Sequence, residues 1–164
     1  MANVHAEVHH GAHATKRYTG IMDWLTTVDH KKIGILYLFS GLFFFAIGGV
    51  EALLIRLQLI GPQMDIVSAQ TFNGLFTMHG TTMLFLAATP IIFAFANFIM
   101  PLQIGARDVA SPFMNALGFW IFFFGGILLN ISWFVGELPD AGWTAYAPLS
   151  TEYSTHRGVD FFLM

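Results

Sequence analysis

The chain has 164 residues, of which 55% are hydrophobic and only 10% are charged, and its mean hydropathy is +0.64. Soluble domains contain about a quarter charged residues, so this composition argues against an ordinary soluble domain. The formal net charge of −3 offers no basic surface to phosphates, which excludes nucleic acid as a partner. The chain contains no cysteine, so any metal or haem must be held by His, Met or oxygen ligands.

Three apolar stretches are long enough to cross a membrane, since about 20 apolar residues in a helix span its hydrocarbon core. We predict transmembrane helices over 33–57, 74–104 and 109–136, with one acid, Glu51, in the first. Helices are expected because lipid offers no partner to unpaired backbone groups. Pro90 is expected to kink the second helix rather than end it. The predicted fold class is an all-α membrane protein with three transmembrane helices.

The remaining segments are more polar. Residues 1–20 include four histidines and are expected to form a flexible cytoplasmic tail. Residues 21–32 are expected to lie at the membrane interface, with Trp24 on a short interfacial helix. Residues 137–164 are punctuated by Pro and Gly, and we expect an extracytoplasmic segment that leads into a fourth helix.

The basic residues are distributed unevenly between the two sides of the predicted helices. Cytoplasmic segments carry an excess of Lys and Arg, so we predict that the N-terminus and the 105–111 loop face the cytoplasm. The residues predicted on that side are Lys16, Arg17, Lys31, Lys32 and Arg107, and those on the other side are Arg56 and Arg157.

His79 is the most informative polar residue. It lies about a turn and a half inside the second predicted helix, roughly 8 Å along the axis from the outer end. A histidine within a transmembrane helix is by default a functional-site hypothesis, and a neutral imidazole is a common protein ligand of haem iron. A structural hydrogen bond to a neighbouring helix is the alternative, and both interpretations remain open from the residues alone.

Arg56 lies at the outer end of the first predicted helix. Gly49 and Ala52 precede it by seven and four residues and therefore share its helix face. Small residues beneath an arginine form a flat surface, against which a partner helix or a planar macrocycle could lie. An arginine that simply extends to the membrane interface is the alternative.

A second group of polar residues occupies the inner ends of the second and third predicted helices. Asn97, Asp108 and Asn115 are expected to lie together, because a short loop joins these antiparallel helices. Amides inside a membrane are costly unless they are paired or hydrated. An acid at the membrane surface with amides deeper in the helices resembles the entrance of a chain of water molecules that conducts protons. The alternative for Asp108 is a solvated carboxylate in a loop.

Three other polar residues lie in or beside the predicted helices. Asn130 is expected to form a hydrogen bond between helices. His30, beside two lysines, is expected to have an interfacial role. The residues alone assign no role to Glu51.

Several blocks of sequence together resemble a known family. The blocks are TVDHKKIGILY at 27–37, IRLQLIGP at 55–62, MHGTTMLFLAATP at 78–90, NFIMPLQIGARDVASPFMNALGFW at 97–120 and GWTAYAPLS at 142–150. Over residues 22–164, the chain resembles the N-terminal third of subunit I of the haem–copper oxygen reductases, in the branch of Bacillus-like cytochrome c oxidases.

The resemblance implies a part of a twelve-helix subunit and assigns roles to residues of the outer half. His79 matches the histidine that ligates the iron of low-spin haem a. Arg56 matches the arginine that contacts the formyl group of that haem, and Gly49 and Ala52 fall on the haem-facing side. Trp143 matches a tryptophan near the haem propionates.

The resemblance also implies a proton route and an overall activity. Asp108 matches the acid at the entrance of the D proton pathway, and Asn97 and Asn115 match asparagines just inside it. The implied activity is that of a respiratory terminal oxidase, which reduces oxygen to water with electrons from cytochrome c and pumps protons across the bacterial cell membrane. The implied partners are the remainder of subunit I, subunits II and III, cytochrome c and membrane lipid.

The high-spin haem and the copper centre of the family are expected in the full subunit, with ligands outside these 164 residues. The chain alone is therefore not expected to be active. Mitochondrial-type members have a glutamate where this chain has Gln58, which argues against a cation site at this position. Ubiquinol-oxidising members have His and Gln where this chain has Thr71 and Gly74, which favours cytochrome c as the donor. A menaquinol oxidase, or a non-catalytic haem-binding membrane subunit, is the alternative.

Overall fold

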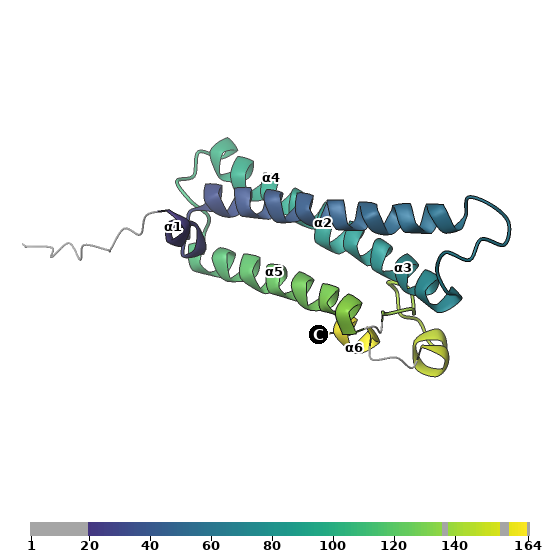
Figure 1. Cartoon of the computed structure of the whole chain (residues 1–164). Helices are drawn as coiled ribbons and strands as arrows, with labels where there is room; N and C mark the ends of the chain where they lie inside the picture. Colours follow the sequence, from purple (N-terminus) through teal and green to yellow (C-terminus); the bar gives the residue numbers. More distant parts are fainter. Residues whose placement is uncertain (1–19, 136–137, 155–157, 164) are drawn as a thin grey trace, which may run out of the picture.

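The computed structural model describes residues 20–135, 138–154 and 158–163. Within these residues, three helical runs are long and apolar enough to cross a membrane: His30–Gln58, Ala69–Gln103 and Pro112–Val135. They lie alongside one another in Figure 1, and no described residue belongs to a strand. The predicted all-α fold with three transmembrane helices is confirmed. The predicted tail lies outside the described residues apart from Gly20.

The first run is the single helix α2 (His30–Gln58), which begins at a capping residue. The side chain of Asp29 accepts a hydrogen bond from the backbone N–H of Lys31 at 2.9 Å, and so satisfies a donor that every helix start leaves unpaired. The helix therefore starts in the charged residues before the apolar stretch. The short helix α1 (Ile21–Leu25) precedes it, and Lys32 joins the two helices through an ion pair of 2.6 Å with Asp23.

The second run consists of α3 (Ala69–Thr81), the π-helical stretch η1 (Thr82–Ala88) and α4 (Thr89–Gln103). Ser68 caps its start by accepting from the N–H of Thr71 at 3.1 Å. The chain stays helical through Pro90, as predicted, and the wider turns of η1 immediately precede this proline. The hydroxyl of Thr89 donates to the carbonyl of Leu84 at 2.8 Å and satisfies one acceptor of this irregular stretch.

We name the end of the bundle at Gln103 the inner end and the opposite end the outer end. At the inner end, α4 is closed by a glycine in the left-handed region, Gly105, with φ of 68°. The N–H of Ala106 bonds to the carbonyl of Pro101 at 2.9 Å, and that of Gly105 to the carbonyl of Leu102 at 3.3 Å. These two bonds are those of a Schellman motif, which ends a helix at glycine. The chain then turns, and α5 begins at Pro112.

Glycines at intervals of seven residues let α2 approach the second run closely. A Cβ atom added to Gly41 would lie 2.9 Å from Cγ1 of Ile91, and one added to Gly48 would lie 2.8 Å from Sδ of Met83. A Cβ atom added to Gly34 would likewise lie close to α4, 3.0 Å from the carbonyl oxygen of Ala94. Small residues at membrane helix contacts permit close backbone packing, so these glycines set the separation of the two runs.

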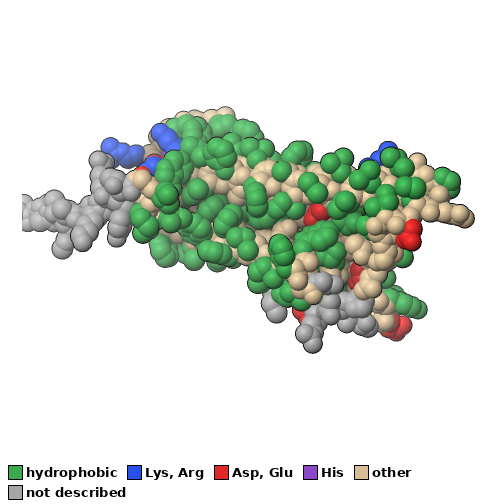
Figure 2. All heavy atoms as spheres, viewed as in Figure 1, with side chains coloured by type: hydrophobic (Ala, Val, Ile, Leu, Met, Phe, Trp, Pro, Cys, Tyr) green, Lys and Arg blue, Asp and Glu red, His purple; other side chains and the backbone are tan. Residues whose placement is uncertain are grey.

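Two packed clusters join all three transmembrane runs. The inner cluster contains Ile33, Tyr37, Ala94 and Phe119, and the outer cluster contains Phe44, Met78, Leu86 and Leu129. The ring of Tyr37 meets that of Phe119 edge to face, with centroids 5.0 Å apart. Hydrophobic side chains also cover the visible surface along the length of the helices (Figure 2).

The outer segment folds back against α3. It contains the short π-helical turn η2 (Leu149–Tyr153), and the later helix α6 (Gly158–Leu163) lies beside the end of α5 (Figure 1). The N–H of Gly142 donates to the hydroxyl oxygen of Thr77 at 3.0 Å. This bond places the 138–154 segment beside the part of α3 that carries His79.

Candidate functional site

The His79 side chain is oriented by a hydrogen bond between two transmembrane helices. Its Nδ1 lies 2.9 Å from the carbonyl oxygen of Gly48 on α2. A carbonyl only accepts hydrogen bonds, so Nδ1 carries the proton, and in the neutral ring the lone pair lies on Nε2. Among the described residues, Nε2 has no partner. Metal-binding histidines commonly donate their second N–H to a backbone carbonyl in this way.

The hydrogen bond expected as the alternative for His79 therefore exists, but it uses only one ring nitrogen and leaves the other available to a metal. His79 also lies deeper in its helix than expected. The helix begins at Ala69, ten residues earlier, which corresponds to about 15 Å along the axis. The difference arises because Ser68 starts the helix in polar sequence, before the apolar stretch.

An open helix face lies next to the carbonyl that binds His79. A Cβ atom added to Gly49 would meet nothing within 4 Å, whereas one added to Gly48 would collide with Met83. Ala52 is half-buried and Arg56 is exposed in the last turn of α2. Gly49, Ala52 and Arg56 therefore form a helix face with small residues below an exposed arginine, and at Gly49 this face is open within the described structure.

Trp143 lies beside the same turn of α3. Its Cδ1 atom would be 3.5 Å from a Cβ added to Gly80, the residue after His79. Its ring centroid is 6.0 Å from that of Phe85 in η1. The side chain remains 46% exposed. The structure therefore brings Trp143 to the turn of α3 that carries His79, although the two are far apart in the sequence.

The three residues of the inner group are placed near one end of the molecule but are not bonded to one another in the described part of the chain. Asp108 is exposed in the loop after α4, and one of its oxygens accepts from the N–H of Val109 at 2.8 Å. The buried Asn97 donates through Nδ2 to the carbonyl of Phe93 at 2.9 Å. The Nδ2 atom of Asn115 is buried and has no hydrogen-bond partner within residues 20–135, 138–154 and 158–163.

The two amides flank the inner cluster on its loop side. Asn97 lies three residues beyond Ala94, and Asn115 lies four residues before Phe119, which belongs to the same cluster. Helix residues three or four apart lie on one face, so both amides stand one turn closer to the Asp108 loop than the cluster does. An unpaired amide donor at this depth is a group that a water molecule would satisfy.

His30 has a closer contact than its expected interfacial role suggested. It is only 3% exposed, and its Nδ1 lies 2.8 Å from the backbone carbonyl oxygen of Asn97. A signal for this contact was present in the sequence. Pro101 follows Asn97 by four residues and lacks the N–H that this carbonyl would otherwise accept.

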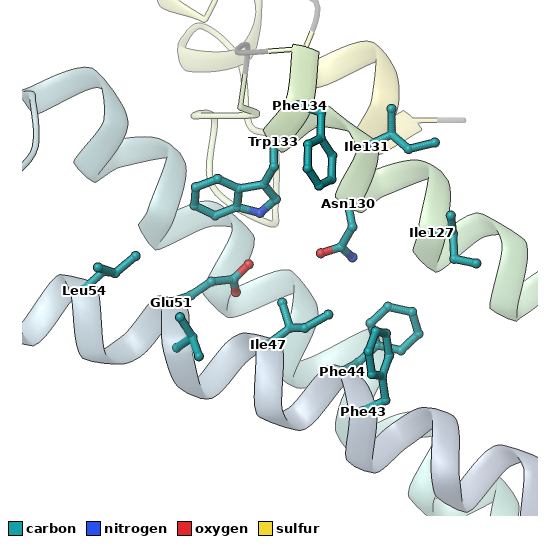
Figure 3. A pocket seen from close by; sticks show the side chains of 11 residues that line it. Phe43, Phe44, Ile47, Glu51, Leu54, Ile127, Asn130, Ile131, Trp133 and Phe134 are labelled. Atoms are coloured by element: carbon teal, nitrogen blue, oxygen red, sulfur yellow. The ribbon is translucent and has the colours of Figure 1, made fainter.

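A cavity of about 540 Å³ lies between α2 and α5 and contains a buried acid (Figure 3). Glu51 is 2% exposed, and neither of its carboxylate oxygens has a hydrogen-bond partner in the described structure. The side chains of Trp133 and Asn130 face it from α5 in Figure 3. Asn130 donates to the carbonyl of Gly126 in its own helix at 2.8 Å. The prediction that Asn130 forms a hydrogen bond between helices is therefore wrong.

No group of three or more His, Asp or Glu side chains that could bind a bare metal ion occurs among the described residues. His79 has one ring nitrogen without a partner in the described part of the chain, and a single imidazole is a donor that could ligate haem iron.

Comparison with known proteins gives the family. Residues 32–164 match cytochrome c and quinol oxidase polypeptide I. The chain is 65% identical over 144 residues to cytochrome c oxidase subunit 1 of Alkalihalophilus pseudofirmus, which covers 88% of this chain and 23% of that protein. It is 62% identical over 151 residues to cytochrome c oxidase subunit 1 of Bacillus subtilis, covering 91% and 24%.

The chain therefore belongs to the family of subunit I of the haem–copper oxidases, as the sequence blocks indicated. It is a multi-pass membrane protein by its three spans and its family. A relative with a different printed name is the probable quinol oxidase subunit 1 of Staphylococcus aureus, at 49% identity over 142 residues. The chain spans about a quarter of the length of these relatives, between 22% and 24%.

Proposed function

We propose that this chain is part of the catalytic subunit of a respiratory terminal oxidase. The full complex would reduce oxygen to water with electrons from cytochrome c and pump protons. This stretch would supply one axial ligand of low-spin haem a and the entrance of the D proton pathway. The observation that carries the proposal is the His79 ring: Gly48, the neighbour of the open position Gly49, holds it through Nδ1, and Nε2 has no partner among the described residues.

Five residues of the outer half would hold the haem. His79 would ligate the iron through Nε2, with its ring direction fixed by the bond to Gly48. Gly49 and Ala52 would give the macrocycle a flat contact, and Trp143 would lie near its propionates. The exposed guanidinium of Arg56 would contact the formyl group, where a positive charge favours the reduced, electron-rich ring. The bound haem supplies one-electron transfer.

Three residues of the inner end would admit protons. Asp108 faces water in an exposed loop, so it exchanges a proton without the cost of leaving water. Asn97 and Asn115 carry neutral amides, which order water molecules without trapping a charge. The buried and unpaired Nδ2 of Asn115 supports this role, because a water of the pathway would be its acceptor.

The orientation and the partners follow from the same proposal. Lys31, Lys32 and Arg107 lie at one end of the helix bundle, which supports a cytoplasmic N-terminus in a bacterial cell membrane. The remainder of subunit I would supply the high-spin haem and the copper centre. Subunits II and III and cytochrome c would be the protein partners, and the chain by itself would not reduce oxygen.

The haem site is tested by filling the open face. In the purified full complex, Gly49→Leu should abolish or strongly reduce the absorbance of the low-spin haem, because the added side chain would occupy the space of the macrocycle. Gly125→Leu is the matched control, since a Cβ there also meets nothing within 4 Å but lies on α5. An unchanged haem spectrum in Gly49→Leu would contradict the proposed position of the haem on this helix face.

A quinol oxidase is the second candidate, because the chain is 49% identical to a protein with that printed name. Turnover of the purified complex with reduced cytochrome c and with reduced menaquinol decides between the two. The main proposal expects oxygen consumption with cytochrome c only. Oxygen consumption with menaquinol alone would establish the second candidate instead.

A further inference from the structure

Pro101 leaves a buried carbonyl without its helical partner. In an α-helix the carbonyl of each residue accepts from the N–H four residues later. Asn97 precedes Pro101 by four residues within α4, and proline has no N–H. The Asn97 residue is buried, so its carbonyl needs a donor from elsewhere in the protein.

His30 supplies that donor from a different transmembrane helix. Its Nδ1 lies 2.8 Å from the Asn97 carbonyl oxygen, across 67 residues of sequence, and the imidazole is buried. One turn further along α2, Gly34 allows the close contact, because a Cβ there would lie only 3.0 Å from the carbonyl oxygen of Ala94. The neutral Nδ1–H tautomer and the protonated ring both donate from this nitrogen, so the bond does not depend on the charge of His30.

We propose that His30 is a positioning residue for Asn97, in which its imidazole replaces the N–H that Pro101 removes. The bond fixes the inner end of α4 against α2. The same turn sets the direction of the Asn97 side chain, whose Nδ2 donates to the carbonyl of Phe93 at 2.9 Å. This inference rests on the proposed function for the role of Asn97 in proton entry, whereas the hydrogen-bond replacement itself rests only on the geometry.

The replacement predicts a specific suppression. His30→Leu in the full oxidase complex should slow proton uptake about fivefold, the factor to which one hydrogen bond of ordinary strength corresponds. Pro101→Ala restores a backbone N–H four residues after Asn97, so adding it to His30→Leu should recover most of the lost rate. His30→Leu with Pro90→Ala is the matched control, because that proline does not face the Asn97 carbonyl, and it should recover nothing.

Two further readouts separate positioning from general damage. The low-spin haem spectrum should stay unchanged in all of these variants, because His79 and Gly48 lie in the outer half. The temperature of half-inactivation should fall in His30→Leu and rise again in the double variant with Pro101→Ala.

The proposal is overturned if the Pro101→Ala double variant is no better than His30→Leu, or if Pro90→Ala recovers the rate equally well. Asn97→Ala distinguishes failure of this inference from failure of the proposed function. If Asn97→Ala leaves proton uptake at the wild-type rate, the proton-entry role of Asn97 fails and His30 has no pathway residue to position. If Asn97→Ala and His30→Leu both slow uptake and only Pro101→Ala suppresses the latter, the proposal stands.

Discussion

The outer and inner halves of the helix bundle each hold one imidazole against a carbonyl of another helix, but their candidate sites differ in how firmly the polar groups are held. In the outer half, a direct hydrogen bond of 2.9 Å between His79 and Gly48 fixes the direction of one imidazole. At the inner end, Asp108 is exposed and Asn115 has an unpaired buried amide nitrogen. A metal ligand needs a fixed direction, whereas a proton entrance needs gaps that water can occupy. The difference between the two halves is therefore the difference that their two proposed tasks require.

The largest effect that would sharpen this comparison is expected from Asp108→Asn. Removing the only titrating group of the inner set should slow proton uptake by about 10²-fold, the lower range for loss of an acid–base group. The low-spin haem spectrum should be unchanged. Stopped-flow measurement of proton uptake by the reconstituted complex tests this.

Asp65→Asn is the matched control for that variant, because Asp65 is an exposed acid in the loop at the opposite end of the bundle. Proton uptake should keep its wild-type rate in Asp65→Asn. If both variants slow uptake equally, Asp108 has no special position, and if Asp108→Asn also changes the haem spectrum, the two halves are not separate.

A smaller effect is expected from the contact that joins α5 to α2 between the two halves. A Cβ on Gly126 would lie 2.7 Å from Cζ of Phe44, so Gly126→Leu should destabilise the complex by about 1–3 kcal/mol through overpacking. The neighbouring Gly125→Leu should change stability by less than about 0.5 kcal/mol, because that position is open. Thermal unfolding of the two variants measures the difference, and equal losses would contradict the packing described for α5.

The smallest effect is expected from Thr77→Val, which removes the acceptor for the N–H of Gly142 and keeps the shape of the side chain. The loss should be about 1 kcal/mol, the usual contribution of one hydrogen bond. Limited proteolysis should cut the 138–154 segment faster in this variant. An unchanged rate of proteolysis would show that the bond between Gly142 and Thr77 is not needed to hold Trp143 beside the turn that carries His79.

The sequence predicted the three spans because their hydrophobic runs are long and nearly free of charge. It predicted the helix starts less well, since helices begin at caps rather than where apolar sequence begins. Asp29 and Ser68 each start a helix in polar residues that the hydrophobic pattern excludes. Cap geometry depends on backbone angles that hydropathy does not encode.

The candidate residues were predictable as residue types, but their partners were not. His79 stands out as a histidine in an apolar helix, whereas its bond to Gly48 depends on how two helices cross. His30 was assigned an interfacial role because its neighbours are charged, although Pro101 marks a carbonyl in need of a donor. The sequence pattern assigns no role to Glu51. Its burial beside the cavity between α2 and α5 depends on how α5 packs, which the sequence pattern does not encode.

The central claim is that His79 ligates a low-spin haem while the inner end handles protons. Its most direct test is the absorption spectrum of the purified full complex carrying His79→Ala, measured beside Asp108→Asn. The account predicts that His79→Ala loses the low-spin haem signal and that Asp108→Asn retains it. A low-spin haem signal of wild-type size and position in His79→Ala would contradict the account.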